Sequence, residues 1–530
     1  MHKLKGRIEG NFLSRWGLMF FGAGSIALAI TIYISKYYHI DSEIFSYLHL
    51  FILEITADTF LARWQPLTTP YFGLWICVFA LLFVLFAVFN MLAKSTTDLV
   101  YSSGIQLLKA QQVKAHANLV ANLDKSPIEL MVHKYVPLSA KMIAGNVFVA
   151  GQQGSGKSTI IKSSLKQLAD KNNKLFVYDL KKEYQSFLNS KKVITISLMQ
   201  TSKVVWSISK DVKTPSDAAA TSIALIENES INDSFFTDAA REIVKGVLLS
   251  LLKLDRNWYW MDLYERLFAP HQQLHQLLVV AYLPAGVLIE ENNKTTQSIR
   301  AVISTKLGWI KQLAEWEHDA TIHFSLKEWL QDDQQVITQL LFQPNLEEKV
   351  MSKSICNAMT TVIATTVLSM PDSDSRRIFL VLDEVGHLPK SPVLEQWLSL
   401  SRSKGGRSIF GLQAYQSLLT IYGKDAAMTI LSLFGTHVVL RQGAASESTE
   451  IASSLLGQHR AISINRTKSA QGDISLSEQF TDRPVVIPER IVNLPMATKE
   501  GVSGFLSVAG SNAVYELQWP FPSEFSDSEN

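Results

Sequence analysis

The sequence has 530 residues, 47% of them hydrophobic, and its 50 Lys and Arg residues against 48 Asp and Glu residues leave a net charge of +2. This length allows two or three domains with cores of their own, and the near-neutral charge excludes a uniformly basic nucleic-acid-binding chain. The two cysteines, Cys77 and Cys356, lie far apart in the sequence. They argue against a disulfide framework or a cysteine zinc site, and they favour a reducing compartment for most of the chain.

Two uncharged apolar segments near the N-terminus, residues 16–35 and 71–93, are long enough to cross a bilayer. A cleavable signal peptide is the alternative for the first, but that segment lacks a small-residue cleavage site and is longer than a typical apolar core. Basic residues flank the pair on its outer sides, whereas the loop at 36–70 has more acidic than basic residues. The positive-inside rule places both termini in the cytoplasm and the loop in the periplasm. Residues 1–93 are therefore expected to form a two-helix transmembrane region.

The rest of the chain alternates predicted strands and helices, which indicates an α/β domain with a parallel-rich sheet. Residues 94–140 are expected to form a polar helical stalk or linker. Residues 141–212 and 321–530 are expected to form the α/β domain, with residues 213–320 as an inserted all-α domain. After a strand–loop–helix at 146–170, strands are expected at 174–181, 193–198, 334–342, 376–384, 408–413, 436–441 and 504–520, and a long helix at 346–369.

The stretch "VFVAGQQGSGKSTI" at residues 147–160 fits the pattern G-x-x-x-x-G-K-[ST]. Glycines let successive backbone N–H groups turn toward phosphate oxygens, and the following helix adds its positive N-terminal end. Lys157 would contact the β- and γ-phosphates of a nucleoside triphosphate, and Ser158 would ligate Mg²⁺. A glycine-rich turn with a surface lysine is the alternative, but the strand before and the helical spacing after the loop are the context that the motif requires. The predicted nucleotide-binding residues are Gly151, Gln152, Gln153, Gly154, Ser155, Gly156, Lys157, Ser158 and Thr159.

A second motif, "RIFLVLDEV", ends an apolar run in Asp383 and Glu384, as a buried parallel strand does at its carboxyl edge. Beside a phosphate-binding loop, Asp383 would order the Mg²⁺ shell together with Ser158, and Glu384 would polarise the attacking water. Solvated acids at an ordinary strand end are the alternative when this motif is taken alone. Asp179 ends another apolar run and is expected at the same sheet edge.

Two more candidates follow the acidic pair. Arg402 lies on a predicted helix that Gly405 and Gly406 end, and Gln413 ends the next strand. A glutamine there is placed to sense the γ-phosphate, and an arginine can reach the nucleotide of a neighbouring subunit. A surface arginine and a helix-capping glutamine fit the same spacing. The predicted catalytic set is Lys157, Asp383, Glu384, Arg402 and Gln413.

These motifs, the two membrane segments, the helical insertion and "SKGGRSIFGLQAYQSLLTIYG" at 403–423 resemble the coupling proteins of type IV secretion and conjugation systems. The chain is most similar to the conjugative DNA-transfer branch. The resemblance implies a RecA-like, membrane-anchored ATPase that uses ATP and Mg²⁺ and forms a homohexamer at the bacterial inner membrane. It also implies that hydrolysis drives single-stranded DNA with its relaxase, or protein substrates, toward the type IV secretion channel.

Within this resemblance, Arg402 matches the family's trans-acting arginine and Gln413 its sensing glutamine. The insertion matches an all-α domain that contacts substrate. Its basic residues are candidates for DNA contact, although each also fits a solvated helix face; they are Lys294, Arg300, Lys306 and Lys311.

Three other functions share parts of this pattern. A DNA-segregation translocase usually has more membrane spans and a winged-helix tail, and an ATP-binding-cassette transporter needs an LSGGQ-like signature that this sequence lacks. A non-motor docking receptor would use ATP only for ring assembly. The acid at Glu384 argues against the receptor, because a structural nucleotide site has no use for a water-polarising carboxylate.

Overall fold

The computed structural model describes residues 100–521, apart from 228–233, 333, 445–446 and 469–473. The predicted membrane segments at 16–35 and 71–93 lie outside the described residues. Within the described part of the chain, no helix is both long and apolar enough to cross a membrane.

The chain divides into two compact units, of which the larger contains Tyr101–Ala461 and Phe480–Asn530. The smaller includes Ile462–Gln479, which carries the distal parts of two strands that pair with each other, β14 (Gln458–Lys468) and β15 (Ile474–Pro484). The larger unit holds every residue of the predicted site.

A ten-stranded mixed sheet forms the centre of the larger unit, in the order β2-β17-β16-β13-β5-β12-β11-β6-β10-β7. The strands from β13 to β7 are parallel, β16 is antiparallel to β13 and β17, and β17 is parallel to β2. The strands span Gln106–Lys109 (β2), Val147–Ala150 (β5), Lys174–Tyr178 (β6), Val193–Ser197 (β7), Gln339–Gln343 (β10), Ile378–Leu382 (β11), Gly406–Leu412 (β12), Thr436–Val439 (β13), Val502–Val508 (β16) and Ala513–Trp519 (β17).

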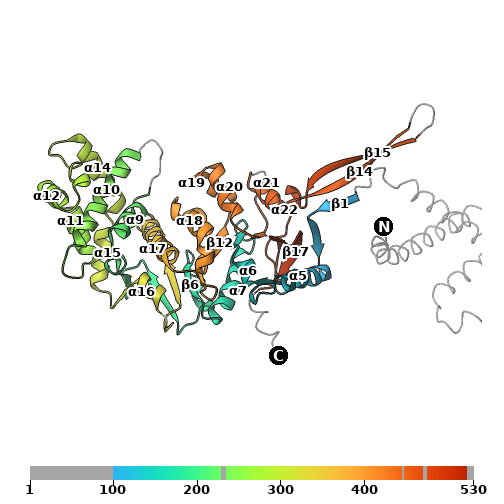
Figure 1. The fold of residues 1–530 in the computed structure, drawn as a ribbon, viewed down its shortest axis with the longest axis horizontal. Helices are drawn as coiled ribbons and strands as arrows, with labels where there is room; N and C mark the ends of the chain where they lie inside the picture. The colour runs from blue at the N-terminus through green and yellow to red at the C-terminus, as the bar shows by residue number, and fades with distance from the viewer. Residues whose placement is uncertain (1–99, 228–233, 333, 445–446, 469–473, 522–530) are drawn as a thin grey trace, which may run out of the picture. The chain divides into compact units, whose positions relative to one another are not determined.

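The central strands are buried along their whole length, which explains their continuous apolar runs. Successive side chains point to opposite faces, so Phe148 joins the core on one face and Val149 the core on the other. Figure 1 shows α7 (Lys157–Asp170) on one side of the sheet and α19 (Tyr415–Tyr422) on the other. The helices that share the core of Phe148 and α19 are α17 (Lys349–Ser369), α18 (Pro392–Leu400), α20 (Lys424–Ser432), α21 (Glu447–Leu455) and α22 (Pro488–Val492).

Between residues 213 and 320 the described residues form helices joined by turns and loops, and none of them lies in a strand. Two short strands flank this segment and pair in parallel, β8 (Val204–Trp206) and β9 (Ile322–Phe324). The helices gather into one group (Figure 1) and are α9 (Pro215–Leu225), α10 (Ser234–Leu251), α11 (Trp260–Leu267), α12 (His271–Ala281), α13 (Leu283–Gly286), α14 (Lys294–Leu307) and α15 (Ile310–His318).

The structure differs from the helical stalk expected at 94–140. In the described part of that segment, the main helix is α5 (Gln111–Asp124), and β2 is an edge strand of the main sheet, in register with β17. The other elements there are β1 (Val100–Gly104), β3 (Ile128–His133), β4 (Val136–Ser139) and the start of α6 (Ala140–Ile143). The stretch at 504–520 is likewise not one strand but the hairpin of β16 and β17.

Candidate functional site

The predicted phosphate-binding loop runs from the end of β5 to the start of α7. Gly151 donates its backbone N–H to the Leu412 carbonyl at 3.0 Å, and the Gln152 backbone N–H donates to the Arg441 carbonyl at 2.9 Å. The end of β12 and the segment after β13 therefore hold the first half of the loop. Gly156 is the N-cap of α7. The first backbone N–H groups of an α-helix have no carbonyl four residues earlier in the helix, and such groups can bind an anion. In α7, Thr159 donates instead to the Gly156 carbonyl at 3.1 Å.

The segment before β16 covers the loop from the other side. Ala497 donates its N–H to the Gly154 carbonyl at 3.3 Å, and the Gln152 side-chain amide donates to Met496 Sδ at 3.4 Å. A Cβ at Gly156 would overlap the side chain of Val502, so only glycine fits there. The sequence did not predict these contacts, because Gln152 and Met496 lie 344 positions apart.

Lys157 is buried and faces both predicted acids. Its Nζ donates to the backbone carbonyl of Asp383 at 2.6 Å and to Glu384 Oε2 at 2.8 Å, and it lies 3.3 Å from Asp383 Oδ1. Side-chain exposure is 5% for the lysine, 1% for Asp383 and 4% for Glu384. The structure thus brings together the three residues that the two motifs predicted, and it buries all three side chains.

Glu384 is fixed at both oxygens, since Oε1 accepts the backbone N–H of Gln413 at 3.2 Å. Gln413 follows β12 directly, and its side chain is half-buried. The predicted sensing residue therefore lies beside the acid, as expected from adjacent parallel strands that end at one edge.

Several buried polar atoms around the loop accept or donate no hydrogen bond among the described residues. They are Ser155 Oγ, Tyr184 Oη and both carboxylate oxygens of Asp383. Burial raises the pKa of the Tyr184 hydroxyl, and the Asp383 charge raises it further. Buried polar groups normally find partners, so these atoms fit a ligand that brings oxygens and a cation. A triphosphate with Mg²⁺ matches: the loop amides and Lys157 would hold phosphate, while Ser158 and Asp383 would hold the metal and its water shell.

Asp179 has a structural role at the same edge. It is fully buried and accepts the backbone N–H groups of Glu183 at 2.9 Å and Tyr184 at 3.2 Å. Burial raises its pKa, although these hydrogen bonds act in the opposite direction. The loop that it holds carries Glu183, whose Oε1 accepts the Ser158 hydroxyl at 2.8 Å. The sequence analysis missed Glu183, which lies in a polar stretch without periodicity.

Arg402 lies at the opposite edge of the sheet. It is exposed on the 3₁₀ turn η5 (Ser401–Lys404), just before β12, and not on the predicted α-helix. Because β12 runs parallel to β11 toward the acids, about 20 Å of strand separates Arg402 from Gln413 at roughly 3.3 Å per residue. The structure therefore does not bring Arg402 to the Lys157 site within one chain.

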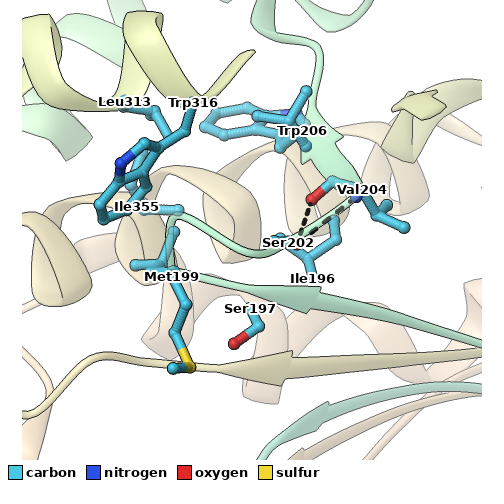
Figure 2. Close-up of a pocket in the computed structure, with 11 residues that line it drawn as sticks. Ile196, Ser197, Met199, Ser202, Val204, Trp206, Leu313, Trp316 and Ile355 are labelled. Carbon is cyan, nitrogen blue, oxygen red and sulfur yellow. Dashed lines mark hydrogen bonds between the residues drawn. The ribbon is translucent and has the colours of Figure 1, made fainter. Parts of the chain in front are cut away.

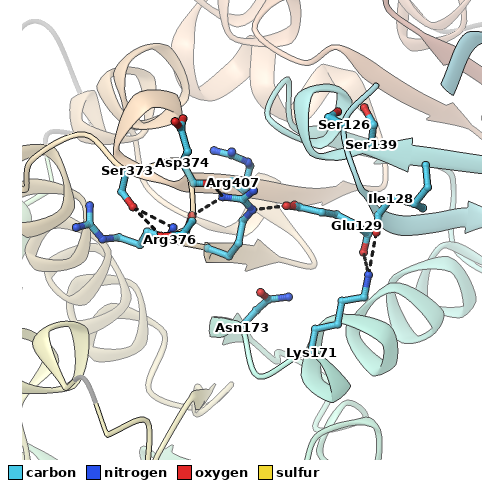
Figure 3. Close-up of polar contacts among 12 residues, drawn as sticks. Ser126, Ile128, Glu129, Ser139, Lys171, Asn173, Ser373, Asp374, Arg376 and Arg407 are labelled. Carbon is cyan, nitrogen blue, oxygen red and sulfur yellow. Dashed lines mark hydrogen bonds and ion pairs between the residues drawn. The ribbon is translucent and has the colours of Figure 1, made fainter. Parts of the chain in front are cut away.

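The turn that carries Arg402 is held by buried and half-buried arginines. Arg407 donates Nη1 to the Arg402 carbonyl at 3.1 Å, and Arg376 donates to the Lys404 carbonyl at 3.1 Å. Burial lowers the pKa of Arg407 to about 10, with a contribution from the like charge of Arg377. Figure 3 shows this edge, where Glu129 on β3 points toward the arginines and pairs with Arg377.

The four basic residues of the insertion are not equivalent. Lys294 and Lys311 are exposed, whereas Lys306 and Arg300 are half-buried. Arg300 donates to the Ala269 carbonyl at 3.0 Å, so it has a structural contact within the helical group.

A separate small hollow lies where β7 and β8 meet α15 and α17 (Figure 2). Its walls are apolar, with Trp206 and Trp316 among the lining residues, and none of the lining side chains is charged. It therefore offers no charged partner for phosphate, and the Lys157 site is the better candidate for nucleotide chemistry.

A mostly parallel sheet with a glycine loop, a buried lysine and an acidic pair at its carboxyl edge defines an α/β P-loop nucleoside-triphosphatase fold. Residues 130–518 match the family described as the type IV secretion-system coupling protein DNA-binding domain. The chain belongs to this family, as the sequence resemblance indicated.

Relatives agree with this assignment. Over 363 residues the chain is 24% identical to coupling protein TraD of Escherichia coli (strain K12), a match that covers 67% of this chain and 50% of TraD. The chain thus matches only about half the length of that relative. Its fold is similar to the bacterial conjugative coupling protein TrwBdeltaN70 in an unbound form, with a TM-score of 0.66, 20% identity and coverage of 80% of this chain and 94% of that one. Plasmid coupling protein TrwB in complex with ADP and Mg²⁺ gives a TM-score of 0.65 and 19% identity, covering 80% of this chain and 95% of that one.

Proposed function

We propose that this chain is a membrane-anchored coupling ATPase of the bacterial inner membrane. It recruits relaxase-bound single-stranded DNA, protein substrates or both, and drives them by ATP hydrolysis toward a type IV secretion channel. The observation that carries the proposal is the buried cluster of Lys157, Asp383 and Glu384 beside a glycine-rich loop. Such a cluster combines phosphate binding, metal binding and a carboxylate for water activation.

ATP and Mg²⁺ are the cofactors that this site fits. The buried oxygens of Asp383, which accept no hydrogen bond from the described residues, and the closely packed glycines support a magnesium-bound triphosphate. TrwB, which shares the fold, has been solved with ADP and Mg²⁺ and with a non-hydrolysable ATP analogue. Bound Mg²⁺ would neutralise charge on the β- and γ-phosphates. Glu384, whose Oε1 accepts the backbone N–H of Gln413, would orient and deprotonate the attacking water.

A homohexameric ring explains the position of Arg402. Its exposed side chain lies at the amino edge of the sheet, so it would act on a neighbour's nucleotide. There it would stabilise transition-state charge, and hydrolysis would change the subunit interface. Two N-terminal membrane helices would anchor this ring with both termini in the cytoplasm.

The test is the ATPase rate of the full-length chain in detergent, with and without single-stranded DNA. We expect DNA to raise the rate, and Lys157→Ala, Glu384→Gln and Arg402→Ala each to abolish it. An equal mixture of the Arg402→Ala and Glu384→Gln proteins should recover part of the activity, because mixed interfaces pair an intact Glu384 site with an intact Arg402.

No recovery on mixing would contradict a trans-acting Arg402. ATP binding without turnover, at any protein concentration and with DNA present, would favour the non-motor docking receptor over the motor.

A further inference from the structure

The Ser158 hydroxyl has a carboxylate partner outside the acidic pair. Its Oγ donates to Glu183 Oε1 at 2.8 Å, and Lys162 Nζ lies 2.6 Å from Glu183 Oε2. Ser158 and Lys162 are four residues apart on α7, so they share one face of the helix. Glu183 therefore bridges two residues of the first turns of the phosphate-binding helix.

The backbone fixes Glu183 in this position. Its own N–H is held by buried Asp179 at 2.9 Å, and the next residue, Tyr184, donates to the second Asp179 oxygen at 3.2 Å. Asp179 directly follows β6, which lies next to β11 in the sheet. The loop from Asp179 to Tyr184 thus lies against the first turns of α7 through Glu183.

The ion pair of Glu183 with Lys162 sets the direction of its hydrogen bond with Ser158. Lys162 Nζ lies 2.6 Å from Glu183 Oε2, and the Ser158 hydroxyl donates to Glu183 Oε1 at 2.8 Å. A carboxylate that pairs with a lysine accepts hydrogen bonds, so the serine proton points at Glu183. The lone pairs of Ser158 Oγ then stay free for a cation.

The acidic pair of Asp383 and Glu384 does not accept the Ser158 proton in the structure. The Asp383 carboxylate accepts no hydrogen bond from the described residues. Glu384 accepts hydrogen bonds from Lys157 Nζ and from the backbone N–H of Gln413. Ser158 has its hydrogen bond to Glu183 instead. In metal sites, an outer carboxylate that accepts a proton from a ligand orients that ligand and strengthens its binding to the metal.

We propose that Glu183 is a positioning residue for magnesium: it holds the Ser158 proton so that the serine oxygen faces the metal, and Lys162 holds Glu183 in place. This inference rests on the proposed binding of a magnesium-bound nucleotide at this loop. Glu183 does not itself ligate the metal or touch the reacting phosphate in this scheme.

The test measures the affinity of the full-length chain in detergent for ADP, once with MgCl₂ and once with EDTA. The readout is the dissociation constant in EDTA divided by the dissociation constant with MgCl₂. This ratio reports how much the metal contributes to ADP binding. Glu183→Gln should lower this ratio about tenfold, within the range for outer carboxylates of metal sites, while the affinity in EDTA stays at the wild-type value. Ser158→Ala should lower the ratio too, and adding Glu183→Gln to it should cause no further loss, because both act through one hydroxyl. Glu265→Gln, at an exposed position of α11, is the matched control.

An unchanged ratio in Glu183→Gln would overturn the inference. So would an equal loss of affinity with and without Mg²⁺, or losses that add fully in the double variant, because either result points to a structural role. If the wild-type chain itself shows no magnesium-dependent ADP binding, the proposed function fails together with the inference. If the wild-type chain binds ADP in a magnesium-dependent way and Glu183→Gln leaves the ratio unchanged, only the inference about Glu183 fails.

Discussion

Lys157 Nζ lies 2.8 Å from Glu384 Oε2, in an ion pair that is almost fully buried. The same ammonium donates to the Asp383 carbonyl at 2.6 Å. The lysine that we propose to contact phosphate and the glutamate that we propose to activate water therefore neutralise each other here. Under this proposal, a bound triphosphate would have to compete with Glu384 for the lysine, and its binding would free the carboxylate for water.

Glu384→Gln should therefore separate binding from turnover. Removing the charge weakens the hold on Lys157, and hydrogen bonds to charged groups contribute about 1.5–3 kcal/mol. We expect affinity for a non-hydrolysable ATP analogue to rise several-fold and phosphate release to fall by at least about 100-fold. Titration with the analogue and a phosphate-release assay check both. A loss of nucleotide affinity would contradict the competition between Glu384 and phosphate.

Lys157→Ala should destabilise the fold even before nucleotide is considered. It leaves two acids buried without their counter-charge, and breaking one partner of a buried pair costs about 3–5 kcal/mol. The thermal unfolding midpoint of the nucleotide-free chain should fall clearly. Adding Glu384→Gln to Lys157→Ala should restore part of the loss, because one uncompensated charge is then removed. Additive effects of the two substitutions would argue against this pair as a stabilising contact.

Gly405 controls the turn that presents Arg402. It has φ of +89°, and an added Cβ would overlap the Arg376 backbone carbonyl. Gly405→Ala should cost about 2–4 kcal/mol, since both a left-handed backbone and a steric clash oppose it. Gly510→Ala is the matched control, with φ of +79° and open space around the position. It should cost only about 1–2 kcal/mol.

Thermal unfolding of both variants tests the difference. Equal shifts for Gly405→Ala and Gly510→Ala would mean that the close approach of Arg376 contributes nothing.

The parts of the site that lie in one short segment could be predicted from the sequence. The glycine loop, Lys157 and Ser158 occur within one run of residues, and the apolar run before Asp383 fixes that acid at a strand end. Parallel strands gather such ends at one edge, so the proximity of Lys157, Glu384 and Gln413 followed from the order of strands and helices.

The features of the fold and site that depend on pairing between strands far apart in the sequence could not be predicted. The expected stalk at 94–140 contains a helix, but the short run "QLLK" becomes β2 only because β17, some 400 residues later, supplies a partner. Met496 and Val502 reach the glycine loop through the antiparallel pairing of β16 with β13. Glu183 lies in a charged loop whose position depends on Asp179, and nothing in its local sequence distinguishes it from a solvated acid.

Glu317 gives the helical insertion a dependence on pH. Its side chain is buried, with Oε2 accepting the Trp260 backbone N–H at 2.7 Å and Oε1 3.8 Å from His323 Nδ1. Burial raises the pKa of this carboxyl to about 7, although the Trp260 hydrogen bond acts in the opposite direction. The folded state therefore holds a proton that the unfolded state releases near pH 4.5, the ordinary value.

Because the folded-state pKa is raised, Glu317 lowers stability as pH rises from about 4.5 through 7. The full shift corresponds to about 3 kcal/mol. Glu317→Gln keeps an acceptor for Trp260 but does not titrate, so it should match the wild type near pH 5 and unfold at a higher temperature near pH 8. Thermal unfolding of both proteins from pH 5 to 8 checks this, with Glu265→Gln as an exposed control. A constant difference between Glu317→Gln and the wild type across that range would contradict a buried, titrating Glu317.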